Sequence, residues 1–184
     1  LPGTKQRLEK LGPEGFAKWL KNQRPIHFTD TTFRDAHQSL LATRVRTHDL
    51  LAVAERFAQA HGHELFSMEV WGGATFDVAL RFLHECPWER LSLLRKAIPN
   101  TLLQMLLRGT NAVGYTAYPN NLIEKFIEQA AATGIDVFRI FDSLNYVPSM
   151  LTSIRTVRER TGSIAEACVC YTSDIFDETR PKYH

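Results

Sequence analysis

Residues 28–39 read Phe28-Thr29-Asp30-Thr31-Thr32-Phe33-Arg34-Asp35-Ala36-His37-Gln38-Ser39, and the rest of the chain is organised around them. They follow on from a short β-prone run, Ile26-His27-Phe28. Polar groups crowded at the end of a strand are costly to bury without partners, so such a cluster points to binding or chemistry. The less specific interpretation is an Asx-type turn closed by an internal salt bridge. The remaining sequence favours a functional cluster.

The composition is that of an ordinary globular domain. The 184 residues are enough for one domain with a substantial core, and 44% of them are apolar and 23% charged. A net charge of +2, without a long Lys/Arg run, argues against a nucleic-acid partner. No apolar run approaches the roughly 20 residues of a membrane span, and the N-terminus lacks a signal-peptide pattern. We therefore expect no membrane partner and no targeting segment.

The three cysteines do not form a disulfide framework. Cys86 stands apart from the close pair in Cys168-Val169-Cys170. An odd number of thiols with this spacing favours a reducing compartment. On an alternating strand the two thiols of the pair share one face, so we expect small buried side chains there in preference to a metal or redox site.

The order of elements predicts repeated βα units. Residues 1–24 are expected to form a lead-in whose short helix starts at Gly12-Pro13-Glu14. Residues 25–184 then alternate, with a strand beginning about every 30–40 residues. The expected strands are 26–29, 64–70, 101–107, 136–141 and 165–171. The expected helices are 47–62 with Thr47 as its N-cap, 76–84 and 88–97 separated by Pro87, 120–133 ended by Gly134, and 148–160.

Polar residues gather after every expected strand. In chain order they are Arg34, Asp35 and Gln38; Glu69 and Asp77; Arg108, Thr110, Asn111 and Tyr115; Asp142, Ser143 and Asn145; and Thr172, Ser173 and Asp174. Nearly unbroken apolar strands such as 102–107 suit a parallel sheet buried on both faces. No Gly-x-Gly-x-x-Gly turn follows the first strand, which argues against a dinucleotide-binding sheet.

A barrel explains this pattern better than an open doubly wound sheet. Active sites of (β/α)₈ TIM barrels are built at the C-terminal ends of the strands, where these polar residues stand. A barrel has eight strands and these residues supply about five. We therefore predict an α/β chain that covers about the first five βα units of a (β/α)₈ barrel.

Several of these side chains suit a small anionic substrate. Arg34 and Arg108 end different strands and can converge on one carboxylate, because two guanidinium N–H donors match its two oxygens. The alternative is that each arginine pairs with a neighbouring acid. Gln38 can donate to a carbonyl or enolate oxygen, and Asp35 is a candidate ligand for a divalent ion.

Other candidates are less specific. His61-Gly62-His63 has metal-like spacing, but it lies at the opposite, stability-related end of a barrel, so we assign it no metal. Four aromatic residues can form either an apolar wall of the site or part of the core: Trp71, Phe76, Tyr115 and Tyr118. The residues alone thus predict an enzyme that acts on a small carboxylate, with a metal as an option.

Four motifs carry a resemblance to a known family. They are Asp30-Thr31-Thr32-Phe33-Arg34-Asp35-Ala36-His37-Gln38-Ser39-Leu40-Leu41-Ala42-Thr43-Arg44, Glu69-Val70-Trp71-Gly72-Gly73-Ala74-Thr75-Phe76-Asp77, Gln104-Met105-Leu106-Leu107-Arg108-Gly109-Thr110-Asn111-Ala112-Val113-Gly114-Tyr115 and Phe138-Arg139-Ile140-Phe141-Asp142-Ser143-Leu144-Asn145. In this order they resemble the carboxyltransferase domain of the pyruvate carboxylase family. Residues 1–24 resemble the segment that joins this domain to the preceding part of that multidomain enzyme.

The resemblance implies biotin-dependent chemistry. In the family, one domain carboxylates biotin with ATP and bicarbonate, and the carboxyltransferase barrel passes the carboxyl group to pyruvate to give oxaloacetate, a step of anaplerosis and gluconeogenesis. On matching positions, Arg34, Gln38 and Arg108 are expected to hold pyruvate and stabilise its enolate. Asp35 is expected to be a ligand of the family's zinc or manganese ion. Asp77 and Tyr115 are expected in the biotin and substrate pocket.

The resemblance also implies parts that these residues do not supply. A carbamylated lysine, a His-x-His pair and a proton-shuttling threonine belong to later strands of the family's barrel, so the fragment alone is expected to be inactive. The full enzyme is expected to be a homotetramer whose partner is a biotin carrier domain, in a bacterial cytoplasm or a mitochondrial matrix. The alternatives are the carboxyltransferase subunit of oxaloacetate decarboxylase or transcarboxylase, a biotin-independent lyase or synthase, and an inactive interaction module.

Overall fold

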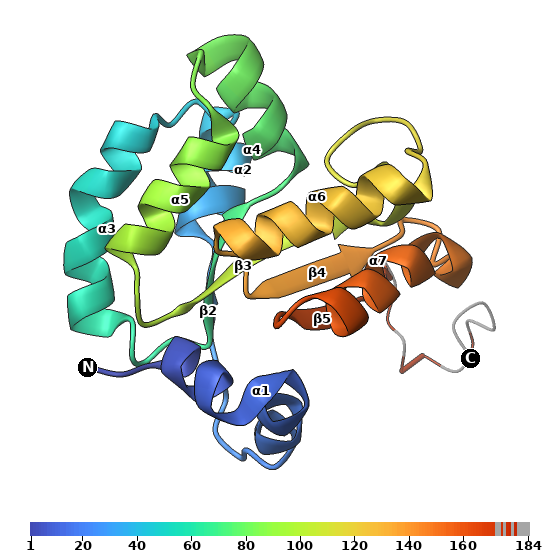
Figure 1. Ribbon diagram of the computed structural model, residues 1–184, viewed down its shortest axis with the longest axis horizontal. Coiled ribbons are helices and arrows are strands. Elements are labelled where there is room, and N and C mark those ends of the chain that lie inside the picture. The colour runs from blue at the N-terminus through green and yellow to red at the C-terminus, as the bar shows by residue number, and fades with distance from the viewer. Residues whose placement is uncertain (172–173, 175, 178, 180–184) are drawn as a thin grey trace.

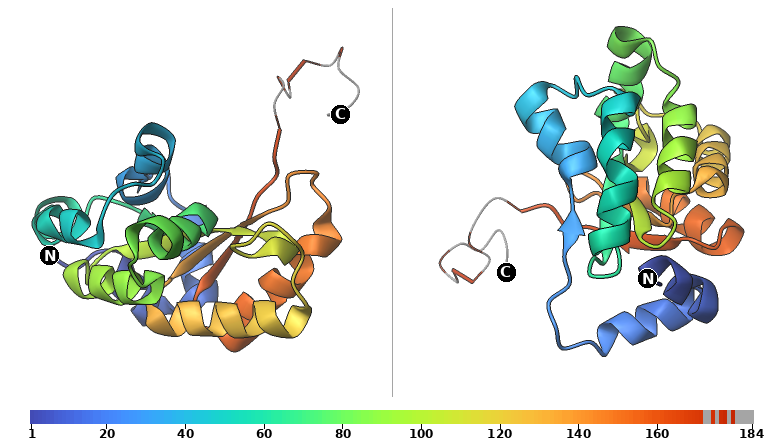
Figure 2. Two further views of the ribbon diagram at one scale, coloured as in Figure 1. Left: turned by 90° about the horizontal axis from the view of Figure 1, so that it is seen from above. Right: turned by 90° about the vertical axis from the view of Figure 1, so that its left-hand side faces the viewer.

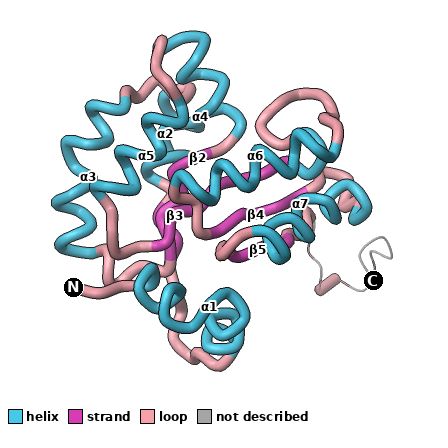
Figure 3. Tube along the Cα trace, in the orientation of Figure 1, coloured by secondary structure: helices cyan, strands magenta, loops and turns pink. Residues whose placement is uncertain are grey.

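A computed structural model describes residues 1–171, 174, 176, 177 and 179 of the chain. This part is built on a five-stranded sheet in the order β1-β2-β3-β4-β5, and all neighbouring strands are parallel (Figures 1 and 3). The strands are β1 Thr29–Asp30, β2 Ser67–Trp71, β3 Leu102–Arg108, β4 Val137–Phe141 and β5 Ile164–Ala167. A doubly wound sheet reverses its strand order at a switch point, whereas a barrel wall keeps the chain order. The predicted fold class, the first five units of an α/β barrel, is confirmed.

Helices cover one face of this sheet. The long ones are α3 Thr47–His61, α5 Pro87–Ala97, α6 Asn120–Thr133 and α7 Val147–Arg160. Shorter helical segments follow the strands: a π-turn Thr32–Ala36 with α2 His37–Leu41 after β1, α4 Gly73–Val78 with a π-turn Ala79–Leu83 after β2, and a 3₁₀ turn Gly109–Asn111 after β3. In Figure 2, α6 and α7 lie on one side of the sheet and α2 on the other. Within the described residues, no helix combines the length and the apolar character that crossing a membrane requires.

The two faces of the sheet differ in chemistry, because successive side chains of a strand point to opposite sides. Toward the helices, the sheet contributes fully buried apolar side chains: Met68, Val70, Leu103, Met105, Leu107, Phe138 and Ile140. The opposite face also carries polar side chains, namely Ser67, Glu69, Gln104 and Arg139. Ser67, Glu69 and Gln104 are fully buried, so β2 and most of β3 are buried on both faces as expected, with polar side chains on one of them.

Helix α1, Thr4–Lys21, closes the N-terminal end of the sheet. Leu8 and Phe16 pack against the first residues of β3 and β4, and Lys5 Nζ forms an ion pair with Asp136 at 2.8 Å. The helix begins eight residues before the predicted start, and Gly12, at a φ of 68°, is a kink inside it. The expected division of the chain after residue 24 stays a prediction.

The boundaries of several other elements also differ from expectation. The strand expected at 26–29 is reduced to Thr29–Asp30, because Ile26 and Phe28 are exposed. Thr47 is the first residue of α3 and not its N-cap; its N–H and hydroxyl both donate to Glu85 Oε2, at 3.0 and 2.6 Å. The strand expected at 165–171 is β5 Ile164–Ala167, and Thr172 and Ser173 lie outside the described residues.

Asp136 should be among the most sensitive positions for stability. Its carboxylate accepts hydrogen bonds from Lys5, from Arg95 Nη1 at 2.7 Å and from the Leu103 N–H at 2.9 Å. Replacing it by alanine leaves the largely buried Arg95 charge without its carboxylate, so we expect Asp136→Ala to lower the free energy of unfolding by about 3–5 kcal/mol. Urea denaturation measures this.

The matched control is Asp49→Ala, which removes an exposed carboxylate in the first turn of α3. It should cost less than about 1 kcal/mol. Equal effects of the two substitutions would contradict the structural role of Asp136.

Candidate active site

The polar stretch after β1 forms a compact helical corner. The Asx-type turn that the sequence allowed is present: the Asp30 carboxylate accepts hydrogen bonds from the Thr32 N–H at 3.1 Å and from the Thr32 hydroxyl at 3.0 Å. The chain then turns through the π-turn into α2. This geometry directs Arg34, Asp35 and Gln38 toward one another, so the turn and the functional cluster occur together.

Arg34 is almost completely buried, with 5% of its surface exposed. Its Nη1 donates to Asp35 Oδ1 at 2.9 Å and to Gln38 Oε1 at 3.2 Å. Its Nε donates to Glu69 Oε1 at 2.6 Å, and Nη2 donates to the same oxygen. The predicted alternative, a pairing of Arg34 with a neighbouring acid, is thus realised with Asp35, and Glu69 adds a stronger, buried pairing.

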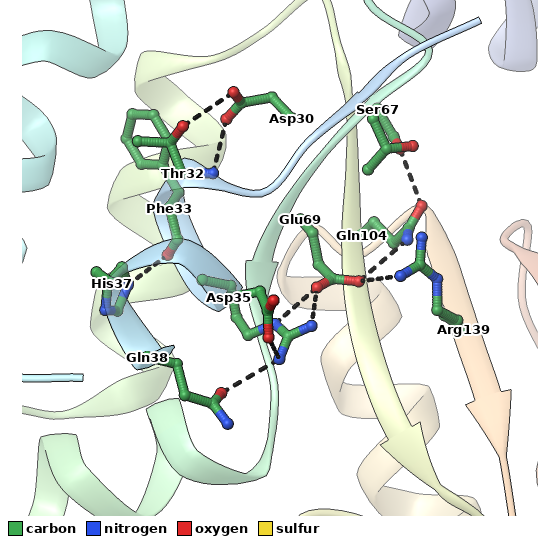
Figure 4. A network of polar contacts seen from close by, with 12 residues as sticks. Asp30, Thr32, Phe33, Asp35, His37, Gln38, Ser67, Glu69, Gln104 and Arg139 are labelled. Carbon is green, nitrogen blue, oxygen red and sulfur yellow. Dashed lines mark hydrogen bonds and ion pairs between the residues drawn. The ribbon is translucent and has the colours of Figure 1, made fainter. Parts of the chain in front are cut away.

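Glu69 is the residue that the sequence did not single out for a role. We expected it near the end of the strand at 64–70, and it lies within β2 with no exposed surface. Its Oε2 accepts from Gln104 Nε2 at 3.2 Å and pairs with Arg139 Nη1 at 3.2 Å. Figure 4 shows Glu69 between Gln104 and Arg139 on one side and Asp35 and Gln38 on the other.

These contacts belong to a chain of polar side chains across the sheet, which we call the interior network: Thr29, Ser67, Glu69, Gln104, Arg139 and Glu166. Ser67 bonds to Thr29 at 2.8 Å and donates to Gln104 Oε1 at 2.9 Å. Arg139 Nε donates to Glu166 Oε1 at 3.0 Å. One signal was available in the sequence, since Glu69, Gln104 and Arg139 each stand between two apolar residues of a strand.

The two predicted arginines lie on either side of Gly72-Gly73. A Cβ atom added at Gly72 would lie 3.6 Å from Arg34 Cδ, and one added at Gly73 would lie 3.2 Å from Arg108 Cζ. An added Cβ atom at Gly73 would also lie 3.0 Å from the Val113 carbonyl oxygen, so the space there is tight. Arg34 follows β1 and Arg108 ends β3, the two strands that pair with β2, so both side chains approach the backbone that follows β2.

Arg108, Tyr115 and Asp77 form a second group beside it. The Arg108 Cζ atom lies 5.8 Å from the centre of the Tyr115 ring, within the range of a cation–π contact. The Tyr115 hydroxyl donates to Asp77 Oδ2 at 3.2 Å, and 69% of the Tyr115 surface is exposed. Arg108 Nη1 also donates to the Gly114 carbonyl at 3.3 Å. The sequence-predicted pair of Asp77 and Tyr115 is thus in direct contact.

Asp35 is accessible for a further ligand, because 49% of its side chain is exposed. One carboxylate does not make a metal site. Among the described residues, no group of three or more His, Cys, Asp or Glu side chains is placed to hold a metal ion. A metal bound at Asp35 would take its other ligands from elsewhere.

Known proteins are similar to this chain in both sequence and structure, although no protein-family model matches it. Pyruvate carboxylase of Bacillus subtilis is 63% identical over 181 residues, which is 98% of this chain and 16% of that protein. Mitochondrial pyruvate carboxylase of Homo sapiens is 57% identical over 98% of this chain and 15% of that protein. The chain thus spans about a sixth of the length of these curated relatives.

Solved structures show the same relationship. The carboxyl transferase domain of Rhizobium etli pyruvate carboxylase with pyruvate and biocytin is 54% identical, with a TM-score of 0.95 over 100% of this chain and 30% of that one. The chain matches a pyruvate carboxylase carboxyltransferase domain. It corresponds to the N-terminal part of that domain. The complete multifunctional enzyme of Rhizobium etli also gives a TM-score of 0.95, over 18% of its chain.

Several candidates from the sequence have structural roles in this carboxyltransferase fold. Trp71 and Phe76 belong to the core and not to a wall of the site: the Trp71 ring is fully buried and stacks on Phe126, with ring centres 5.8 Å apart. Tyr118 also packs against that core. His61 is paired with Glu64 at 3.0 Å.

The polar residues after β4 also act locally. Asp142 accepts hydrogen bonds from the N–H groups of Leu144 and Tyr146 and from the Ser149 hydroxyl, each at 2.9 Å. These hydrogen bonds lower the pKa of Asp142 below its ordinary value, and the bond from the Tyr146 N–H has the largest effect. Asn145 bonds to the Cys170 carbonyl at 2.7 Å and to its N–H at 2.8 Å. These side chains shape a loop of the domain and do not point to a role in substrate binding.

His37 lies directly beneath the Arg34 corner. It is buried, and its Nε2 donates to the Phe33 carbonyl at 2.8 Å, whereas Nδ1 has no hydrogen-bond partner within the described chain. Burial lowers the pKa of His37 below its ordinary value of 6.5, and the bond to Phe33 raises it by less. The positive charges of Arg90 and Arg34 lower it further. The folded protein therefore favours the neutral form of His37.

This neutral histidine predicts a pH dependence of stability. As the pH falls below 6.5, the unfolded chain protonates its histidine while folded His37 stays neutral, so the free energy of unfolding falls as the pH drops toward the lowered folded-state pKa. Because glutamine does not titrate, we expect the free energy of unfolding of the His37→Gln protein to fall less than that of the unsubstituted protein as the pH drops. Urea denaturation between about pH 7.5 and pH 5 measures it.

His48→Gln is the control, because the His48 side chain is 91% exposed. It should follow the unsubstituted protein at every pH. A His37→Gln protein whose stability also follows that curve would show that His37 protonates as freely in the folded protein as in the unfolded chain.

Proposed function

We propose that this chain forms the N-terminal part of an active site that passes a carboxyl group from carboxybiotin to pyruvate, giving oxaloacetate. The observation that carries the proposal is the approach of Arg34 and Arg108 to the same Gly72-Gly73 backbone. Two arginine side chains that approach one stretch of backbone at this edge of the sheet suit a small carboxylate. The relatives named above are pyruvate carboxylases, which favours pyruvate as the acceptor over the substrates of the sister biotin enzymes.

Pyruvate would be bound through its carboxylate by the arginines. When its methyl group loses a proton, negative charge develops on the enolate oxygen, and fixed cations and N–H donors stabilise that charge. Gln38 is suited to donate here: its Oε1 accepts from Arg34, which turns the amide NH₂ group toward other acceptors. The new C–C bond then forms between the enolate carbon and the carboxyl carbon of carboxybiotin as the C–N bond to biotin breaks, and the proton lost by the methyl group ends on that biotin nitrogen.

The contact of Asp77 with Tyr115 places a phenol and a carboxylate beside Arg108, and we assign this group to the biotin and substrate pocket. Structures of the Rhizobium etli domain contain pyruvate with biocytin and, in another case, oxamate with biotin. Asp35 is assigned as one ligand of a divalent metal, zinc or manganese, which would polarise the substrate oxygen when bound. Carboxylate oxygen is a suitable donor for such ions.

The proposal extends to the longer enzyme of which the relatives are examples. Biotin would be carried on a separate carrier domain, and ATP and bicarbonate would be used by a third domain. The assembly would be a homotetramer. The relatives include a bacterial protein and mitochondrial proteins, in line with a bacterial cytoplasm or a mitochondrial matrix.

Substitution of the arginines tests the proposal. In the full-length protein that contains these residues, Arg34→Ala or Arg108→Ala should lower kcat/KM for pyruvate about 10²- to 10³-fold, the effect of removing one donor to a developing oxyanion. A coupled assay of oxaloacetate formation measures the rates.

Arg56→Ala, which removes an exposed arginine of α3, should leave the rate unchanged. Full activity in the Arg34 and Arg108 variants would refute the assignment, and a parent protein that forms no oxaloacetate would refute the proposed reaction.

A further inference from the structure

Four polar contacts hold the buried carboxylate of Glu69. It carries a charge at a position with no exposed surface, and both carboxylate oxygens are fully used. Oε1 accepts two bonds from Arg34, and Oε2 faces Gln104 and Arg139, each at 3.2 Å. Rotation of the carboxylate would break all four contacts, so its orientation is fixed.

This fixed carboxylate determines which edge of Arg34 remains for other ligands. The Nε and Nη2 atoms are turned inward to Glu69 Oε1. The Nη1 atom is turned toward Asp35 and Gln38. Without the inward bonds, the guanidinium group could rotate about its side-chain torsions and present a different edge.

Two carboxylates of the interior network share Arg139 but differ in their other partners. Glu69 forms ion pairs with both Arg34 and Arg139, whereas Glu166 forms an ion pair with Arg139, at 3.0 Å, and with no other cation among the described residues. Both acids lie on strands of the same sheet, β2 and β5. A residue that acts through Arg34 can therefore be distinguished from one that only supports the sheet.

We propose that Glu69 is a positioning residue, which orients Arg34 so that the Nη1/Nη2 end of its guanidinium group, where one Nη2 N–H is not used by the bonds above, faces the substrate carboxylate. This rests on the proposed function, in which Arg34 binds pyruvate. The Arg139 and Gln104 side chains hold the second oxygen of Glu69 and thereby lock the orientation from the far side of the sheet. The affinity for pyruvate and the rate of its carboxylation then depend on the buried charge of Glu69, although Glu69 does not contact the substrate.

The test compares Glu69→Gln with Glu166→Gln in the full-length enzyme that carries these residues. Glutamine has nearly the shape of glutamate but no charge, and its NH₂ group would face the donors of either Arg34 or Arg139 and Gln104. We expect Glu69→Gln to lower kcat/KM for pyruvate about 10- to 100-fold, the range seen when a partner that orients a binding side chain is removed. Glu166→Gln should stay within about twofold of the parent.

Two further measurements separate positioning from stability. The biotin-carboxylation half-reaction with ATP and bicarbonate, which does not use Arg34, should be unchanged by Glu69→Gln. In an Arg34→Lys background, adding Glu69→Gln should cost little more, because residues that act through one another are not additive. If Glu69→Gln unfolds, as thermal melting would reveal, Glu69→Asp is assessed by the same criteria.

Each outcome has one meaning. A parent enzyme without oxaloacetate formation would refute the proposed function itself. An active parent with Glu69→Gln as active as Glu166→Gln would refute the positioning role alone. A full, additive loss in the Arg34→Lys background would show that Glu69 does not act through Arg34 and would also refute it.

Discussion

Glu69 holds a charge where water does not reach it, and a buried carboxylate of this kind is tolerated only with cations and hydrogen-bond donors around it. Its partners come from three separate elements: Arg34 from the turn after β1, Gln104 from β3 and Arg139 from β4. Satisfying Glu69 therefore requires the parallel register of the strands and the helical corner at the same time. The site geometry is a consequence of this requirement.

The fold was largely predictable because it depends on local patterns. Helix α6 begins and ends at the predicted residues, since an amphipathic run is followed by Gly134, whose φ of 140° suits the end of a helix. Strand ends were less predictable, because pairing and not propensity sets them. The β-prone Ile26 and Phe28 are exposed outside β1. The corner at Thr32–Ala36 was missed because long-range bonds to Arg34 accompany it.

The site was predictable only where position along the chain carries the information. Arg34, Arg108 and Asp35 follow strands of a parallel sheet, and the C-terminal ends of such strands meet at one edge. Glu69 was missed as a functional candidate because its partners are 35 residues or more away in sequence. The same positional rule does not separate site residues from structural ones. Trp71 packs into the core and Asp142 shapes its own loop.

The most direct test of the account is a crystal structure of the full-length protein with oxamate, a carboxylate present in a structure of the Rhizobium etli domain. The account predicts the oxamate carboxylate beside Gly72-Gly73, with the Nη1/Nη2 end of Arg34 and with Arg108 at about 2.7–3.2 Å from it. It also predicts that Nε and Nη2 of Arg34 keep their bonds to Glu69. Oxamate bound away from both arginines, or an Arg34 released from Glu69 on binding, would contradict it.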